Sequence, residues 1–156
     1  MNWERICERF IVPDMSELLA RAVIIRGETV LVARMKGAAF TFLPGGHVEE
    51  GEGLQGALSR ELFEELGVNV TTSEYLGFAE HVWFEQAKPV WEINHCFAVA
   101  IRSDVSMVSK EAALAFEWVR LSRLSEVNLQ PPTLVSLITR YVSGDHSIWA
   151  EPRTRG

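Results

Sequence analysis

The segment RELFEELGV, from Arg60 to Val68, brings three glutamates together on a stretch with helical periodicity. They are Glu61, Glu64 and Glu65. Residues three and four apart are neighbours on a helix surface, and like charges there cost about 0.2–0.5 kcal/mol per pair. Helix formation alone therefore does not explain why three carboxylates stand so close together.

The leucines of the same segment show which way this helix faces. Leu58, Leu62 and Leu66 form one apolar stripe that is expected to dock on a sheet, and the glutamates lie at the border of that stripe. Partial burial strengthens the repulsion between them. A hard divalent cation such as Mg²⁺ relieves it, because Mg²⁺ binds carboxylates together with waters and substrate phosphates. A solvated Glu-rich helix is the common alternative, so this segment alone does not establish a metal site.

The residues before the helix make the pattern specific. From Gly46 to Val68 the chain reads GHVEEGEGLQGALSRELFEELGV, which resembles the Nudix box, G-x5-E-x7-R-E-U-x-E-E-x-G-U, where U is a bulky aliphatic residue. Every defined position matches. The matching residues are Gly46, Glu52, Arg60, Glu61, Leu62, Glu64, Glu65, Gly67 and Val68. The preceding FLPGG and the later FEWVRLSRL are also similar to this family, so the resemblance extends over about residues 20 to 142.

The resemblance implies both a fold and an activity. The fold class is α/β, a Nudix-type α/β/α sandwich with a mixed β-sheet. The implied activity is Mg²⁺-dependent hydrolysis, with Mn²⁺ as an alternative cation, of a nucleoside diphosphate linked to another moiety. A bound cation neutralises phosphate oxygens and makes a water nucleophilic, and a nearby carboxylate can accept the proton of that water.

Individual roles also follow from the resemblance. Glu61 and Glu65 look like metal ligands, Glu64 like a ligand or the base that activates water, and the carbonyl of Gly45 like a further ligand. A salt bridge between Arg60 and Glu52 is expected to hold the loop against the helix. The expected catalytic set is Glu52, Arg60, Glu61, Glu64 and Glu65.

A later carboxylate often completes such a site. Glu111 lies shortly before the pair Glu117–Trp118, where some family members place it, and Glu92 is its rival on a half-polar strand face. Glu80 and Glu117 are further alternatives. The sequence leaves this choice open.

Substrate-binding residues outside the box are less sharply indicated. Arg34 and Lys36, at the end of a strand, can reach a phosphate or be solvated. Histidines in the later strands can face the substrate or take part in structural hydrogen bonds, and aromatic residues there can stack on a base or belong to the core, which is the default. These residues are His81, Trp83, Phe84, Trp91 and His95.

The order of elements indicates strands, a helix, more strands and a final helix. In the expected strand 90–101, one face is small or polar rather than charged throughout, so we expect another element to cover it. The expected strands are 20–27, 28–37, 74–85, 90–101 and 116–124, and the expected helices are 54–66, capped by Gly67, and one that begins at Pro131 and Pro132.

Length and composition indicate one soluble domain over residues 1–156, with a core at about 20–142, an N-terminal extension at 1–19 and a frayed tail at 150–156. Neither a signal peptide nor a membrane-spanning run is visible, so a cytoplasmic location is expected. Cys7 and Cys96 have no metal-ligand spacing, and two free thiols are favoured over a disulfide.

The substrate is the least determined property. The expected partner is a small nucleoside diphosphate derivative, and nucleotide sugars, ADP-ribose, nucleoside triphosphates and 5′-triphosphorylated RNA all stay open. The net charge of −6 disfavours nucleic acid and an anionic membrane. A homodimer is left open. The alternative function is a catalytically weak Nudix module that senses a nucleotide.

Overall fold

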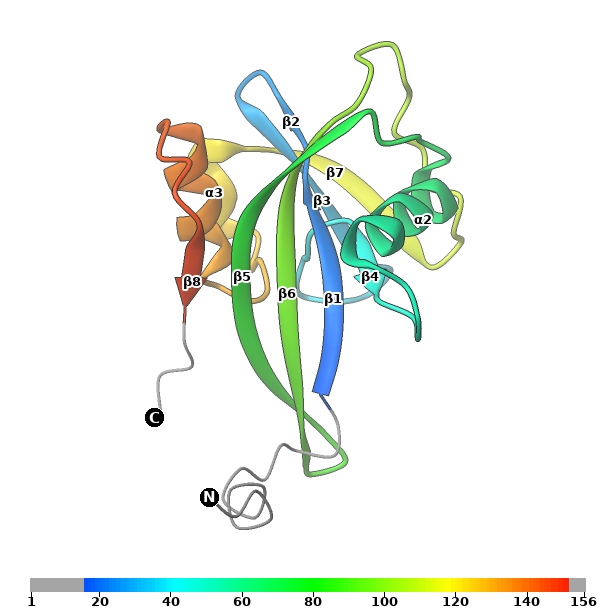
Figure 1. Cartoon of the computed structure of the whole chain (residues 1–156), viewed down its shortest axis with the longest axis vertical. Coiled ribbons are helices and arrows are strands. Elements are labelled where there is room, and N and C mark those ends of the chain that lie inside the picture. Colours follow the sequence, from blue (N-terminus) through cyan, green and yellow to red (C-terminus); the bar gives the residue numbers. More distant parts are fainter. Residues whose placement is uncertain (1–15, 152–156) are drawn as a thin grey trace, which may run out of the picture.

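The computed structural model describes residues 16–151 and contains a mixed five-stranded sheet (Figure 1). Its strands, in spatial order, are β4 (Gly45–His47), β1 (Ser16–Val23), β6 (Lys88–Ala100), β5 (Thr72–Glu85) and β8 (Trp149–Glu151). The pairs β1–β6 and β5–β8 are parallel, whereas β1–β4 and β5–β6 are antiparallel. Cys7 and most of the expected N-terminal extension lie outside the described residues.

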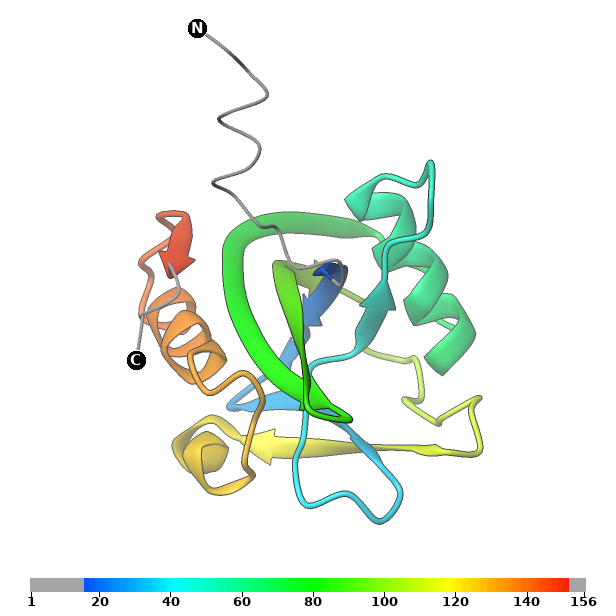
Figure 2. The same cartoon turned by 90° about the horizontal axis from the view of Figure 1, so that it is seen from below.

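A second, antiparallel sheet and two α-helices complete the fold. The sheet has the order β2 (Ile25–Arg26), β3 (Thr29–Met35) and β7 (Leu114–Arg120), and the 3₁₀-helix η1 (Leu121–Glu126) follows β7. The helices are α2 (Leu54–Leu66) and α3 (Leu134–Val142), which lie on opposite sides of the strands (Figure 2). The predicted sandwich of helices about a mixed sheet is confirmed.

Residues 96–99 of strand β6 are buried on both faces of the sheet, because each face packs into one of two apolar clusters. Phe97 and Val99 pack into the apolar cluster that contains the leucines of α2. Cys96 and Ala98 pack into the cluster that contains α3. The expectation that the small and polar face of this strand is covered is therefore confirmed.

The helix α2 begins and ends where its periodicity predicted. Gly67 caps it in the left-handed conformation, with φ 68°, and its N–H donates to the carbonyl of Phe63 at 2.8 Å. The first strand differs from the prediction: it begins at Ser16 instead of residue 20, because β1 pairs with β6 from Ser16, opposite Trp91, onward.

The hairpin and the C-terminal segment also differ from the prediction. Gln86 and Ala87, with φ 47° and 65°, form a tight turn, so β5 and β6 continue through the expected connection and Pro89 lies within β6. Phe84, expected in the core, is 70% exposed near this turn. The expected frayed tail began at residue 150, but β8 pairs residues 149–151 with β5. Among residues 16–151 no helix is long and apolar enough to cross a membrane.

Neighbouring residues of α2 give a direct test of its docking. Leu62 is fully buried against the sheet, whereas Phe63 is 57% exposed. We expect Leu62→Ala to lower the free energy of unfolding by about 2–5 kcal/mol, since it leaves a cavity in the core. The matched variant Phe63→Ala should change it by about 0.5 kcal/mol or less. Urea denaturation measures both, and equal losses would contradict this orientation of α2.

Candidate functional site

Arg60 organises the carboxylates of the loop and of α2. Its Nε and Nη2 donate to the two carboxylate oxygens of Glu52 at 2.9 and 3.0 Å, so the expected salt bridge is present and bidentate. Its Nη1 donates to Glu61 at 2.9 Å and to Glu64 at 3.3 Å, and Nη2 also donates to the carbonyl of His47 at 2.9 Å. The hydrogen bond with Arg60 lowers the pKa of Glu52. One guanidinium thus ties the loop to the helix and offsets the crowded negative charge.

Glu65 is the buried member of the glutamate set, with an exposure of 3%. Its Oε2 accepts a hydrogen bond from the backbone N–H of Gly45 at 3.0 Å. Burial raises the pKa of Glu65 to about 7, even though the Gly45 hydrogen bond and the charge of Arg21 oppose this change. The negative charges of Glu61 and Glu111 raise the pKa further.

Two glycines bring β4 close to both β1 and α2. Gly45 has φ 119°, and a Cβ there would lie 2.1 Å from the carbonyl oxygen of Ala20. A Cβ on Gly46 would lie 2.5 Å from the carboxyl carbon of Glu61. The absence of both side chains therefore lets the carboxylates of α2 approach the backbone of β4.

The later carboxylates lie in different places. The charge of Glu111 acts on Glu65, and the neighbouring Lys110 N–H donates to the carbonyl of Glu65 at 2.6 Å. Glu92 lines a pocket with Trp83. Of the two candidates for the additional carboxylate, Glu111 and Glu92, it is thus Glu111 that lies on the side of α2.

Arg21 is a partly buried cation that was not predicted from the sequence. Its Nη1 donates to the carbonyls of Gly45 at 2.7 Å and Leu43 at 3.2 Å, and its Nε donates to Asn94 Oδ1 at 3.3 Å. Burial lowers the pKa of its guanidinium, and the charges of Glu92 and Glu65 oppose this change. The detectable signal was a single charged residue between small apolar ones in the strand ARAVII.

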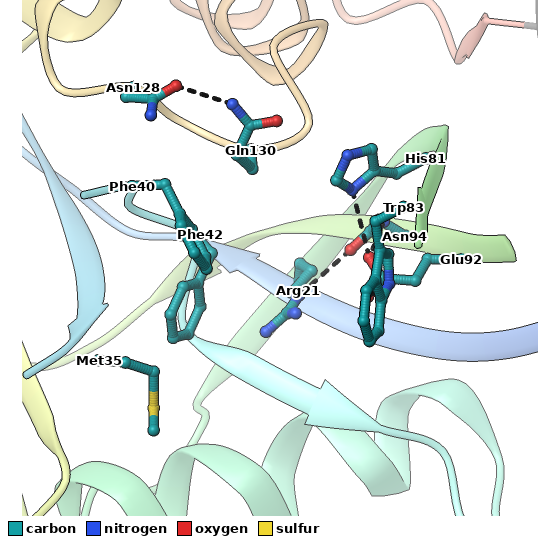
Figure 3. Close-up of a pocket in the computed structure, with 10 residues that line it drawn as sticks. All are labelled: Arg21, Met35, Phe40, Phe42, His81, Trp83, Glu92, Asn94, Asn128 and Gln130. Carbon is teal, nitrogen blue, oxygen red and sulfur yellow. Dashed lines mark hydrogen bonds and ion pairs between the residues drawn. The ribbon is translucent and has the colours of Figure 1, made fainter. Parts of the chain in front are cut away.

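Gly45 connects the carboxylates to a pocket of about 470 Å³, because its N–H faces Glu65 while its carbonyl accepts a hydrogen bond from Arg21. Arg21 lies at the wall of this pocket (Figure 3). The pocket combines aromatic rings with amides and charges, as small-molecule sites commonly do. Its lining residues are Arg21, Met35, Phe40, Phe42, His81, Trp83, Glu92, Asn94, Asn128 and Gln130.

The pocket includes only part of the predicted substrate-binding set. His81 and Trp83 line it, whereas Arg34 and Lys36 are not among its lining residues in the described chain. Arg34 instead donates to the carbonyl of Ala38 at 3.2 Å. Phe40, Phe42, Asn128 and Gln130 were not anticipated, since they come from loops without a strong pattern. His95, expected to be structural, hydrogen-bonds to the hydroxyl of Tyr75 at 2.8 Å.

Glu92 is held inside this pocket by neutral donors and a histidine. Its Oε1 accepts from Trp83 Nε1 at 2.9 Å, and its Oε2 lies 3.5 Å from Asn94 Nδ2 and 3.6 Å from His81 Nδ1. Burial tends to raise the pKa of Glu92, but His81, Arg21 and Asn94 outweigh it, so that pKa is lowered. The surroundings of Glu92 therefore favour the ionised form of its carboxylate.

The donor types around α2 suit a hard divalent cation, because all of them are carboxylate or carbonyl oxygens. The buried carboxyl of Glu65 and the carboxyl of Glu61, which occupies the space over Gly46, are the clearest candidates. Within residues 16–151, however, no three His, Cys, Asp or Glu side chains are placed to hold a metal ion together. Arg60 accounts for this arrangement, since it draws Glu52, Glu61 and Glu64 around itself.

Comparison with known proteins agrees with this geometry. A family model described as NUDIX domain matches residues 17–141. A Bacillus subtilis (strain 168) protein named "Putative 8-oxo-dGTP diphosphatase" is 28% identical over 102 residues, which are 65% of this chain and 64% of that protein. The match thus spans less than two thirds of the relative's length.

Solved structures show the same fold. The MutT protein from Methanosarcina mazei Go1 superposes with a TM-score of 0.65 at 20% identity, and covers 86% of this chain and 98% of its own. The mutator MutT protein from Bacillus halodurans superposes with a TM-score of 0.62 at 22% identity, and covers 78% and 80%.

The raised pKa of Glu65 has a measurable effect on stability. The metal-free folded protein holds this proton up to about pH 7, whereas the unfolded chain releases it near the ordinary value of 4.5. This contribution to stability is therefore fully present below the unfolded value and is lost as the pH rises through the folded value. We expect the melting temperature of EDTA-treated wild type to fall over this interval more steeply than that of Glu65→Gln. Calorimetry checks this, and parallel slopes would contradict it.

The space above Gly46 gives a second test. In Gly46→Ala the new methyl group displaces the carboxylate of Glu61, so we expect hydrolysis with Mg²⁺ to fall by about 10–100-fold, with a higher Mg²⁺ requirement. Thermal stability should change little, because the contact is with the end of a flexible side chain. The control is Gly53→Ala, whose Cβ would meet nothing within 4 Å. Equal activity of the two variants would contradict the role of Gly46.

Proposed function

Since the chain belongs to the Nudix family through residues 17–141, we propose that it is a pyrophosphohydrolase that cleaves a phosphoric anhydride bond in a nucleoside diphosphate derivative. The observation that carries this proposal is the connection at Gly45, whose N–H faces the carboxylates of α2 and whose carbonyl faces Arg21 in the pocket. One ligand can thereby place a base in the pocket and its phosphates beside α2.

The cation of this reaction would be Mg²⁺ or Mn²⁺, held by Glu61 and Glu65, with Glu64 and Glu111 as further donors. The carbonyl of Gly45, expected from the sequence as a ligand, instead accepts a hydrogen bond from Arg21. When bound, it supplies charge neutralisation on the phosphates and a more acidic water. Arg60 and Glu52 act as positioning residues, since their bidentate pair fixes the loop against the helix. This assignment uses Glu111 in preference to Glu92, which lies in the pocket.

The chain's own residues would perform the remaining steps. Water provides the oxygen of the new P–O bond, the bridging P–O bond breaks, and a carboxylate of α2 accepts the proton of the water. Glu64 is the candidate base because its side chain is the most exposed of the three, at 51% against 17% for Glu61. The phosphate on the far side of the broken bond leaves together with the rest of the substrate, and the nucleoside monophosphate is the other product.

The proposed substrate class is a purine nucleoside triphosphate of the 8-oxo-dGTP type. The name of the Bacillus subtilis relative suggests it. The pocket supports it, because Phe40, Phe42 and Trp83 offer aromatic surface for a base, while Asn128 and Gln130 offer amides for its edges. A single domain and a cytoplasmic location stay predictions from the sequence, and a homodimer stays an open possibility.

A panel of nucleotides tests the proposed activity. We expect release of nucleoside monophosphate from 8-oxo-dGTP or dGTP with Mg²⁺, and loss of activity with EDTA. Glu64→Gln should lower kcat by about 10²–10⁴-fold, because a positioned base is lost. The control Glu50→Gln alters an exposed glutamate of the same loop and should leave kcat unchanged.

The sensing alternative predicts a different result. Wild-type protein would then bind nucleotides without cleaving any of them, and Glu64→Gln would behave like the wild type. Product analysis by chromatography, combined with binding calorimetry, separates the two functions.

A further inference from the structure

Glu92 occupies an unusual place for a charged residue. It lies on the pocket face of β6, the central strand of the five-stranded sheet, and its side chain is 16% exposed. The proposed reaction does not use it, since the carboxylates of α2 would hold the cation that binds the phosphates. An ionised group that is kept inside an aromatic pocket needs polar partners, and a ligand can supply some of them.

Arg21 lies near Glu92 but donates no hydrogen bond to it, so the carboxylate oxygens of Glu92 stay able to accept from other donors. Arg21 directs its donors to two backbone carbonyls and to Asn94 Oδ1, so Asn94 stands between the guanidinium and the carboxylate. Since Asn94 Oδ1 faces Arg21, its Nδ2 faces Glu92. The negative charge of Glu92 is therefore not consumed by a direct ion pair with this arginine.

The hydrogen bonds of Glu92 are uneven between its two oxygens. Trp83 holds Oε1 at 2.9 Å, whereas the partners of Oε2 stand at 3.5 and 3.6 Å, beyond the usual range for a strong bond. An ionised carboxylate can accept about four hydrogen bonds. Glu92 is thus oriented by Trp83 and still able to accept from a ligand in the pocket.

The nucleobases differ in what they can offer such a group. Guanine presents two neighbouring donors, N1–H and the exocyclic amino group, which match the two oxygens of a carboxylate. Adenine and cytosine place a ring acceptor beside their amino group, and uracil places its one donor between two carbonyls. An acceptor beside an ionised carboxylate is repelled, so this geometry favours guanine.

We propose that Glu92 selects guanine bases by accepting hydrogen bonds from N1–H and from the exocyclic amino group. This inference rests on the proposed function, because it places the base of the same substrate. Guanine and 8-oxoguanine share this edge, so Glu92 favours both equally over other bases. Discrimination between the two belongs to other groups of the pocket.

Inosine nucleotides isolate the proposed contact because they lack only the exocyclic amino group. For wild-type protein we expect kcat/KM for GTP to exceed that for ITP by about 10–100-fold, the usual effect of one hydrogen bond to a charged group. Glu92→Gln keeps an oxygen for Trp83 but replaces one acceptor with a donor. In this variant the ratio should fall to near unity, with dGTP and 8-oxo-dGTP losing activity alike.

The control is Glu85→Gln, an exposed glutamate on the same hairpin, which should keep the wild-type ratio. An unchanged GTP/ITP ratio in Glu92→Gln, or no preference in the wild type, overturns the proposal. Calorimetric binding of GMP and IMP separates this outcome from failure of the proposed function. If wild type hydrolyses nothing but binds GMP more tightly than IMP, and Glu92→Gln does not, the base assignment stands and the activity falls. If the wild type hydrolyses no nucleotide and binds neither GMP nor IMP, the base assignment and the proposed activity are both wrong.

Discussion

The close approach of β4 to its neighbours is the constraint on which the site depends. Neither Gly45 nor Gly46 has a side chain, and a methyl group on either would collide with Ala20 or with Glu61. This approach lets the Gly45 N–H reach Glu65 and lets the Gly45 carbonyl accept from Arg21. A two-residue backbone contact therefore fixes the distance between the glutamates of α2 and the pocket.

Charge balance follows from the same arrangement. Arg60 donates a hydrogen bond to the more exposed Glu61, and the positive charge of Arg21 lowers the pKa of the buried Glu65. The helix would otherwise accumulate negative charge at a half-buried surface, which folding alone does not favour. The positive charges of Arg60 and Arg21 reduce the repulsion between these carboxylates in the metal-free protein. The carboxylate oxygens stay on this surface as possible ligands of a cation.

The sequence predicted the local parts of this structure well and the non-local parts poorly. The helix 54–66 and its Gly67 cap follow from spacing within one short segment, and the Arg60–Glu52 pair in that segment follows from the resemblance to the Nudix box. Arg21 was missed because its partners lie more than twenty residues away, at Leu43, Gly45 and Asn94. The position of Glu111 beside Glu65 likewise depends on how the loop between β6 and β7 packs against α2, which the sequence pattern does not specify.

The pocket is assembled from many separate segments, in contrast to the single segment that holds the glutamates. Its walls come from β1, β3, the loop at residues 40–42, the β5–β6 hairpin and the loop at residues 128–130. A substitution in any one of these segments can alter which ligand fits the pocket without changing the glutamates of α2. Duplicated copies of such a gene can therefore diverge in the ligand that fits this pocket while the glutamate segment is inherited unchanged.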